Sequence, residues 1–142
     1  MILNEMQVIN GALDRIWRIA VDVDNWTAWD PHEKKSEIYG PFAVGTKGYS
    51  KPRGGPEAHW IITDVEFQKQ WSLLNKMPIG SLAVTNSYEK LAGEKVRCGK
   101  KMVVSGLILN LLFWIHFAKV TRRDMHETWE ALEKHANSPS SG

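Results

Sequence analysis

The chain has 142 residues, of which 43% are hydrophobic and 24% are charged, and this is typical of one soluble globular domain with a sizeable core. Its formal net charge of +2 is too small to indicate a nucleic acid partner, and we expect none. With a single cysteine, Cys98, no disulfide can form within the chain, which favours a reducing, cytoplasmic location. We interpret Cys98 as a buried small apolar residue.

The N-terminal segment predicts one strand and two short helices. Residues 2–9 alternate loosely between apolar and polar side chains, as a strand does. Asn10 is a suitable N-cap for the helix that we expect over residues 12–23. A second short helix over residues 23–28 must end before Asp30, because the residue that precedes a proline is disfavoured in the helical conformation.

The centre of the chain predicts six strands separated by turns, most of which contain glycine or proline. The expected strands cover residues 34–39, 46–51, 58–67, 71–77, 82–91 and 95–105. The last two form a hairpin, and in the final strand apolar side chains alternate with basic ones. Such alternation is typical of an antiparallel strand with one buried face.

Residues 107–136 contain no proline and no glycine, and their apolar side chains recur every three or four positions. This pattern predicts one long helix with a buried stripe. At about 1.5 Å per residue it would be roughly 45 Å long, so it must be kinked or overhang the domain. Residues 107–120 are apolar on nearly every face. Residues 121–136 are amphipathic, and we expect the sheet to hold them through Met125, Trp129 and Leu132.

The order of elements predicts an α+β fold in which a curved antiparallel sheet of about seven strands wraps around the long C-terminal helix. Two short helices follow the first strand. We expect a single domain over residues 1–136 and a disordered tail over residues 137–142. A curved sheet around one helix leaves room for a cavity with mostly apolar walls.

Several segments resemble the SRPBCC superfamily of helix-grip domains. Residues 8–31 carry a strand, a break of small residues, a helix with Trp17, and the segment of residues 24–29 with two tryptophans. Residues 39–48 and 60–66 resemble a later turn and the fourth strand. The superfamily includes birch-pollen-allergen-like proteins, START domains and polyketide cyclase/dehydrase-like proteins, and we favour the last branch. The resemblance implies a helix-grip fold that hosts carriers as well as enzymes.

Two segments depart from the pattern of the superfamily. Residues 67–70 replace a proline-rich turn that many relatives have, and residues 107–120 are bulkier and more apolar than expected. The sequence has no catalytic signature, and none of its histidines stand at ligand spacing, so we expect neither a metal nor a cofactor.

Candidate ligand-binding residues follow from the strand faces. In residues 58–67 we expect the odd-numbered side chains to face inward, because that set ends in Val65 and Phe67 whereas the other ends in two acids. Together with residues on the other strands and the long helix, the candidates are His59, Ile61, Thr63, Trp71, Asn86, Tyr88, Met102, Asn110 and Trp114. His59 could equally lie at the rim, and Tyr88 could equally be a core aromatic whose hydroxyl is satisfied.

Three functions remain open from the sequence. The first is binding of an apolar small molecule, such as a lipid, a sterol or an aromatic polyketide. The second is a cyclase or dehydratase in which His59, Tyr88 and Asn86 supply acid–base and oxyanion groups. The third is a homodimer or membrane-surface contact through residues 107–120. Lys119 and the arginines that follow it border this apolar run.

Arg122 falls on the stripe of the long helix where an apolar residue is expected. It could pair with Asp22 or Asp24, or meet a ligand anion, since a buried arginine needs a partner. We favour a third arrangement, in which its long side chain reaches solvent.

Overall fold

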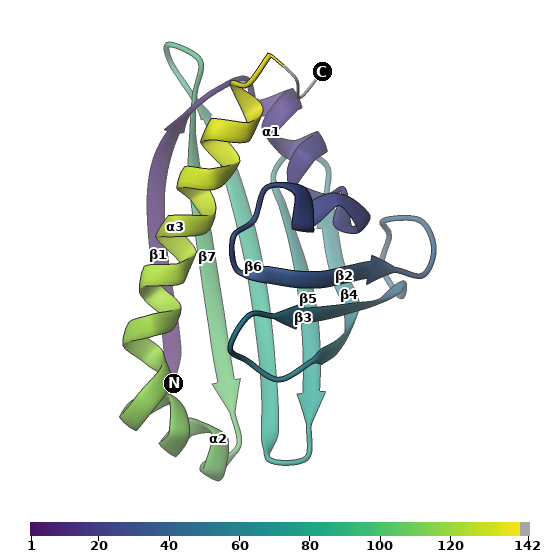
Figure 1. Ribbon diagram of the computed structural model, residues 1–142, viewed down its shortest axis with the longest axis vertical. Coiled ribbons are helices and arrows are strands. Elements are labelled where there is room, and N and C mark those ends of the chain that lie inside the picture. The colour runs from purple at the N-terminus through teal and green to yellow at the C-terminus, as the bar shows by residue number, and fades with distance from the viewer. Residues whose placement is uncertain (140–142) are drawn as a thin grey trace.

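The computed structural model describes residues 1–139 and contains one curved antiparallel sheet (Figure 1). Its seven strands lie in the order β1-β7-β6-β5-β4-β3-β2. The strands are β1 (Ile2–Asn10), β2 (Glu33–Ile38), β3 (Lys47–Pro52), β4 (Ala58–Glu66), β5 (Gln70–Met77), β6 (Gly80–Leu91) and β7 (Lys95–Ser105). Figure 1 shows β2 and β3 running across the other strands, so the sheet curls around the helices.

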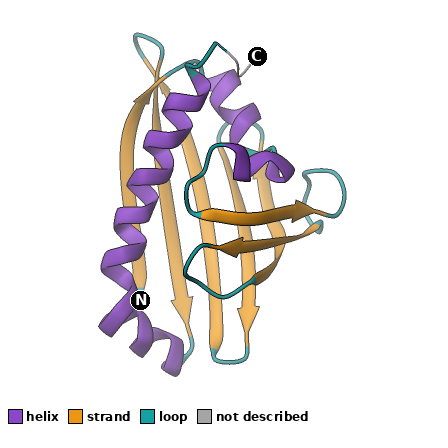
Figure 2. Ribbon diagram, viewed as in Figure 1, coloured by secondary structure: helices purple, strands orange, loops and turns teal. Residues whose placement is uncertain are grey.

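The helices all lie on one face of this sheet (Figure 2). They are α1 (Leu13–Ala20), the 3₁₀ helix η1 (Val23–Ala28), α2 (Leu107–Leu112), the π-helical segment η2 (Phe113–Phe117) and α3 (Ala118–Ala136). The predicted α+β architecture, with two short helices after the first strand and a long C-terminal helix, is confirmed. Residues 140–142 of the expected tail lie outside the described residues.

The predicted N-cap at Asn10 is wrong. The ladder between β1 and β7 continues through Asn10, which pairs with Lys95, so this residue is still strand. Its backbone N–H donates a hydrogen bond of 2.6 Å to Glu133 Oε2 on α3. The helix α1 begins at Leu13. Ala12 occupies the N-cap position and provides no side-chain hydrogen bond.

The C-terminal helix is held by the sheet through its second half, as predicted. Met125, Trp129 and Leu132 are buried on α3 within the main core. The helix is also kinked: its axis changes direction where η2 interrupts the α-helical hydrogen bonds (Figure 1). The change of direction lets α3 follow the sheet while α2 lies across one end of the domain.

The core lies between α1, α3 and the concave face of the sheet. Cys98 on β7 is fully buried there, and burial raises the pKa of its thiol to about 12, so the expected apolar role fits its surroundings. No helix among residues 1–139 is both long enough and apolar enough to cross a bilayer.

Candidate functional site

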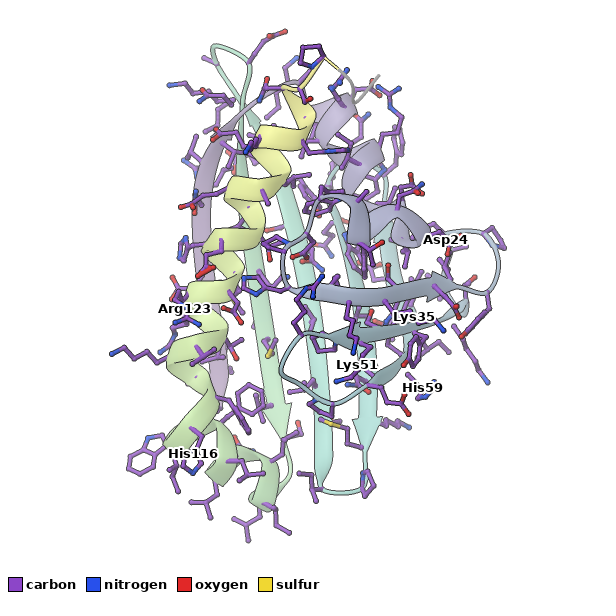
Figure 3. All side chains as sticks on the ribbon, in the orientation of Figure 1. Asp24, Lys35, Lys51, His59, His116 and Arg123 are labelled. Carbon is purple, nitrogen blue, oxygen red and sulfur yellow. The ribbon has the colours of Figure 1, made fainter. Side chains whose placement is uncertain are left out.

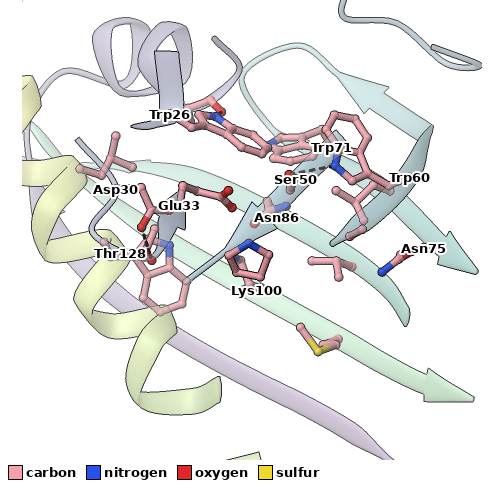
Figure 4. A pocket seen from close by; sticks show the side chains of 18 of the residues that line it. Trp26, Asp30, Glu33, Ser50, Trp60, Trp71, Asn75, Asn86, Lys100 and Thr128 are labelled. Atoms are coloured by element: carbon pink, nitrogen blue, oxygen red, sulfur yellow. Dashed lines mark hydrogen bonds between the residues drawn. The ribbon is translucent and has the colours of Figure 1, made fainter. Parts of the chain in front are cut away.

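A cavity of about 280 Å³ lies between the concave face of the sheet, η1 and α3 (Figure 4). Its walls are dominated by indole rings, which come from three different parts of the chain: Trp26, Trp29, Trp60, Trp71 and Trp129. The ring of Trp26 packs against those of Trp60 and Trp71, with centroid distances of 6.1 and 6.0 Å. These three tryptophans therefore form one continuous aromatic part of the cavity wall.

The position of Trp60 depends on a glycine. Gly48 on β3 pairs directly with Trp60 on β4, and a Cβ atom at Gly48 would lie 2.2 Å from the indole ring. Trp60 Nε1 donates a hydrogen bond of 3.0 Å to Ser50 Oγ, and its ring stacks on Trp26 at 6.1 Å between centroids. A missing side chain on one strand therefore makes room for a wall of the cavity on the next.

Trp71 and Tyr88 are linked inside the cavity wall. Trp71 Nε1 donates a hydrogen bond of 3.2 Å to the hydroxyl oxygen of Tyr88. The ring of Tyr88 also packs edge-on against Trp17 at 5.5 Å, and burial raises the pKa of its hydroxyl. Tyr88 thus has the contacts of a core aromatic, although its side chain also borders the cavity.

Side chains on the sheet form rows across the floor of the cavity, since paired residues on neighbouring strands face the same side. The first row is Lys100, Asn86 and Trp71, on β7, β6 and β5. The second row is Met102, Val84 and Leu73, and the third is Val104, Leu82 and Asn75. Polar side chains therefore stand in the first and third rows, with an apolar row between them.

The first row faces two carboxylic acids, Asp30 and Glu33, that come from the connection between η1 and β2. Burial and, to a smaller extent, the neighbouring Asp30 raise the pKa of Glu33 to about 7, although Lys100 opposes both effects. Burial also lowers the pKa of Lys100. Asp30 Oδ1 accepts hydrogen bonds from the backbone N–H of His32 at 2.9 Å and from Thr128 Oγ1 at 3.4 Å. Three ionisable groups thus share one end of an otherwise apolar cavity.

Four of the sequence-predicted residues line this cavity: Trp71, Asn86, Tyr88 and Met102. The structure does not bring His59, Ile61, Thr63, Asn110 or Trp114 to it. Asn110 uses its amide to donate hydrogen bonds to the backbone oxygens of Val104 and Gly106, at 3.0 and 2.8 Å.

The predicted inward face of β4 is wrong. Trp60 and Ile62 are buried, whereas the side chain of His59 is 70% exposed and points away from α3 (Figure 3). The reason is a bulge at Thr63, because Ile62 pairs with Leu73 while Asp64 pairs with Ser72. Val65 does face the core after the bulge, as expected, but the alternation is reversed before it.

Lys100 and Glu33 line the cavity but were not among the residues predicted from the sequence. Lys100 could have been found, because it lies between Cys98 and Met102 on the same alternating face of β7. Glu33 carries no comparable signal, since its burial depends on how the connection after η1 folds over the sheet.

Arg122 is not paired with Asp22 or Asp24. Its side chain is 47% exposed, so it reaches solvent, and its Nε lies 3.3 Å from Glu5 Oε1 on β1. Near the middle of α3, Asp124 and Glu127 lie 3.6 and 3.3 Å from His32 Nε2, and all three could offer ligand atoms to a metal. Arg123 also pairs with both carboxylates, which balances their charge.

The sequence matches no family model and no curated protein. Solved structures nevertheless share its architecture. A hypothetical protein from Helicobacter pylori is 12% identical and has a TM-score of 0.81, with 96% of this chain and 88% of that chain covered. A START superfamily protein from Mycobacterium smegmatis is 13% identical, with a TM-score of 0.73 and coverage of 95% and 96%.

Norcoclaurine synthase from Thalictrum flavum, in complex with dopamine and hydroxybenzaldehyde, is 14% identical, with a TM-score of 0.67 and coverage of 94% and 84%. The chain has the helix-grip fold. The predicted resemblance to the SRPBCC superfamily is thus confirmed at the level of the fold. The polyketide cyclase-like branch stays a prediction.

Proposed function

We propose that this protein binds a small, largely aromatic molecule in the cavity between the sheet and α3. The observation that carries the proposal is the cavity of about 280 Å³ with five tryptophans in its walls. Ligand pockets commonly measure about 300–1,000 Å³, so this one suits a compound of one or two rings better than a sterol or a lipid with two acyl chains. The norcoclaurine synthase complex, which holds two single-ring molecules in the same fold, supports ligands of this size.

Native mass spectrometry of the purified protein tests whether a small molecule is retained, and calorimetric titration with two-ring aromatic compounds tests binding directly. Val84→Phe places a larger side chain on the cavity floor and should abolish binding. Val103→Phe is the matched control, because Val103 alternates with cavity-facing Met102 and core residue Val104 on β7. Equal binding by both variants would contradict the proposal.

The position of His59 does not favour the alternative function as a cyclase or dehydratase. This residue was expected to act as the base, but it lies on the other face of β4. Burial raises the pKa of the Tyr88 hydroxyl, and this effect outweighs the lowering by the hydrogen bond that Trp71 donates, so the hydroxyl holds its proton firmly. Of the three residues suggested for catalysis, Asn86 and Tyr88 line the cavity and His59 does not.

A second function is favoured by the surface of α2 and η2, which we propose docks on an anionic membrane. Leu107 is 89% exposed and Trp114 is 76% exposed. Their exposed apolar neighbours along the same segment are Ile108, Leu111, Ile115, Phe117 and Val120. An apolar cluster of this size is unusual on a soluble monomer, and tryptophan is typical of membrane interfaces.

The charge around this apolar cluster favours a lipid surface over a second copy of the chain. Residues 107–123 contain three Lys and Arg residues, Lys119, Arg122 and Arg123, and no acidic ones. Lys119 forms no ion pair among the described residues, whereas Arg122 pairs with Glu5 and Arg123 pairs with Asp124 and Glu127. An apolar helix face bordered by basic side chains binds anionic lipid through both contacts, whereas two such faces would repel each other in a symmetric dimer.

Sedimentation with phosphatidylcholine vesicles that contain phosphatidylglycerol tests the docking surface. Trp114→Ser should release the protein from these vesicles, and binding should weaken as salt rises. Phe67→Ser is the matched control, because Phe67 is 74% exposed on the turn between β4 and β5. A stable dimer in light scattering, or vesicle binding that ignores lipid charge, would contradict this proposal.

A further inference from the structure

Three polar side chains of the cavity, those of Asn75, Asn86 and Lys100, have no hydrogen-bond partner among residues 1–139. The side chains of Asn75 and Asn86 belong to residues that are more than nine-tenths buried, yet neither side-chain amide makes a hydrogen bond in the described part of the chain. Lys100 makes neither a hydrogen bond nor an ion pair among residues 1–139. Buried polar groups are normally paired, because each unpaired one costs about 1–3 kcal/mol. Groups left unpaired beside an empty space therefore point to a ligand or water that pairs with them.

Two of these unpaired side chains face the same position in the cavity. Asn86 and Lys100 are directly paired residues of β6 and β7, so their side chains stand next to each other on the cavity floor. Glu33 reaches the same end from the opposite wall, and its Oε2 atom is buried without a hydrogen-bond partner (Figure 4). An amide, an amine and a carboxyl group thus face one position at the edge of the apolar floor.

The charges around this position select the chemistry of the ligand. A carboxylate would meet Lys100 favourably but would be repelled by Asp30 and Glu33. An ammonium group would be attracted by Asp30 and Glu33 but repelled by Lys100. A neutral hydroxyl suits all three, because its oxygen can accept hydrogen bonds from Asn86 and Lys100 while its proton is donated to Glu33.

We propose that the ligand is a hydroxylated aromatic compound, whose hydroxyl group binds Lys100, Asn86 and Glu33 while its rings lie over Val84 and Leu73. This inference rests on the proposed function, since it assigns the chemical class of the molecule in the same cavity. The ring system packs on the second row and against the tryptophans, and the apolar row separates the hydroxyl end from Asn75 at the far side of the cavity (Figure 4).

The test compares three two-ring probes by isothermal titration calorimetry at about pH 7: 2-naphthol, naphthalene and 2-naphthoate. Hydrogen bonds to otherwise unpaired buried groups should make 2-naphthol bind roughly tenfold more tightly than naphthalene. Lys100→Met keeps the length of the side chain but removes its charge and its donors, and should reduce this preference to less than about threefold. Lys101→Met is the matched control, because Lys101 is the exposed neighbour on the same strand.

The outcomes separate the two proposals. If neither 2-naphthol nor naphthalene binds the wild type, both the proposed function and this inference fail. Equal affinity for the two probes would overturn the inference and leave the cavity-binding function intact, and so would tighter binding of 2-naphthoate. Circular dichroism verifies that Lys100→Met is folded. If it is not, Asn86→Leu takes its place, and an unchanged preference in that variant would overturn the inference.

Discussion

Glu33 makes the stability of this protein depend on pH in a direction opposite to that of most carboxylic acids. Burial and the neighbouring Asp30 together raise the pKa of Glu33 from 4.5 to about 7, although Lys100 opposes them. The folded state therefore binds the proton more tightly than the unfolded state, and the free energy of unfolding must fall as the pH rises from about 4.5 to about 7. A difference of about 2.5 pH units at about 1.4 kcal/mol each gives a loss of about 3 kcal/mol.

Glu33→Gln removes this titration and should therefore be more stable than the wild type at pH 8, by up to about 3 kcal/mol. The two proteins should differ by less than about 0.5 kcal/mol at pH 4.5, where Glu33 is protonated in the folded wild type and about half protonated in the unfolded chain. The gain at pH 8 is an upper bound, because Lys100 loses a favourable neighbour in the variant.

Urea unfolding followed by tryptophan fluorescence at pH 4.5, 6, 7 and 8 measures this difference. Other carboxylic acids titrate in both proteins, so their contributions cancel when the variant is compared with the wild type. Glu66→Gln is the control, because Glu66 is exposed at the end of β4 and should change stability by less than about 0.5 kcal/mol at any pH. A constant difference between Glu33→Gln and the wild type across the whole range would refute the argument.

Three further predictions concern the walls of the cavity and the core. Gly48→Ala should destabilise the protein by about 1–3 kcal/mol because the new methyl group overlaps the ring of Trp60, and a change within about 0.5 kcal/mol would show that the strands give way freely. Trp129→Ala should cost about 3–5 kcal/mol in urea unfolding, whereas Trp114→Ala should cost less than about 0.5 kcal/mol; similar values would contradict the burial of one and the exposure of the other. Cys98 should react with Ellman's reagent at pH 8 only after unfolding, since burial raises the pKa of the thiol to about 12, and rapid reaction in the folded state would be inconsistent with its position.

The strands could be predicted from the sequence because turn residues and alternation mark each of them locally. Gly93, for example, has a positive φ of 78° in the turn between β6 and β7, where the hairpin was expected. The alternation of side chains along each strand also predicted which face of β5, β6 and β7 points inward. It failed on β4, because one extra residue at Thr63 reverses the face, and a bulge of this kind has no local sequence signal.

The candidate site could be predicted only in part, for a related reason. Trp71, Asn86 and Met102 are placed by the sheet itself, so counting along a strand is sufficient. Glu33 is placed by the connection after η1, whose path over the sheet is decided by long-range packing. The side chains that give the cavity its acidic groups therefore depend on tertiary structure, whereas most of its floor does not.

The kink in the C-terminal helix separates the two proposed activities. Trp129 and Leu132 on α3 close the cavity, while Leu107 and Trp114 lie on α2 and η2, where the helix axis turns across the end of the domain. No residue of α2 or η2 lines the cavity. The affinity for 2-naphthol should therefore be unchanged in Trp114→Ser, and vesicle binding should be unchanged in Lys100→Met. If either variant alters both activities severalfold, the cavity and the membrane-docking surface are coupled, and the helix must transmit a change through η2 that its static packing does not require.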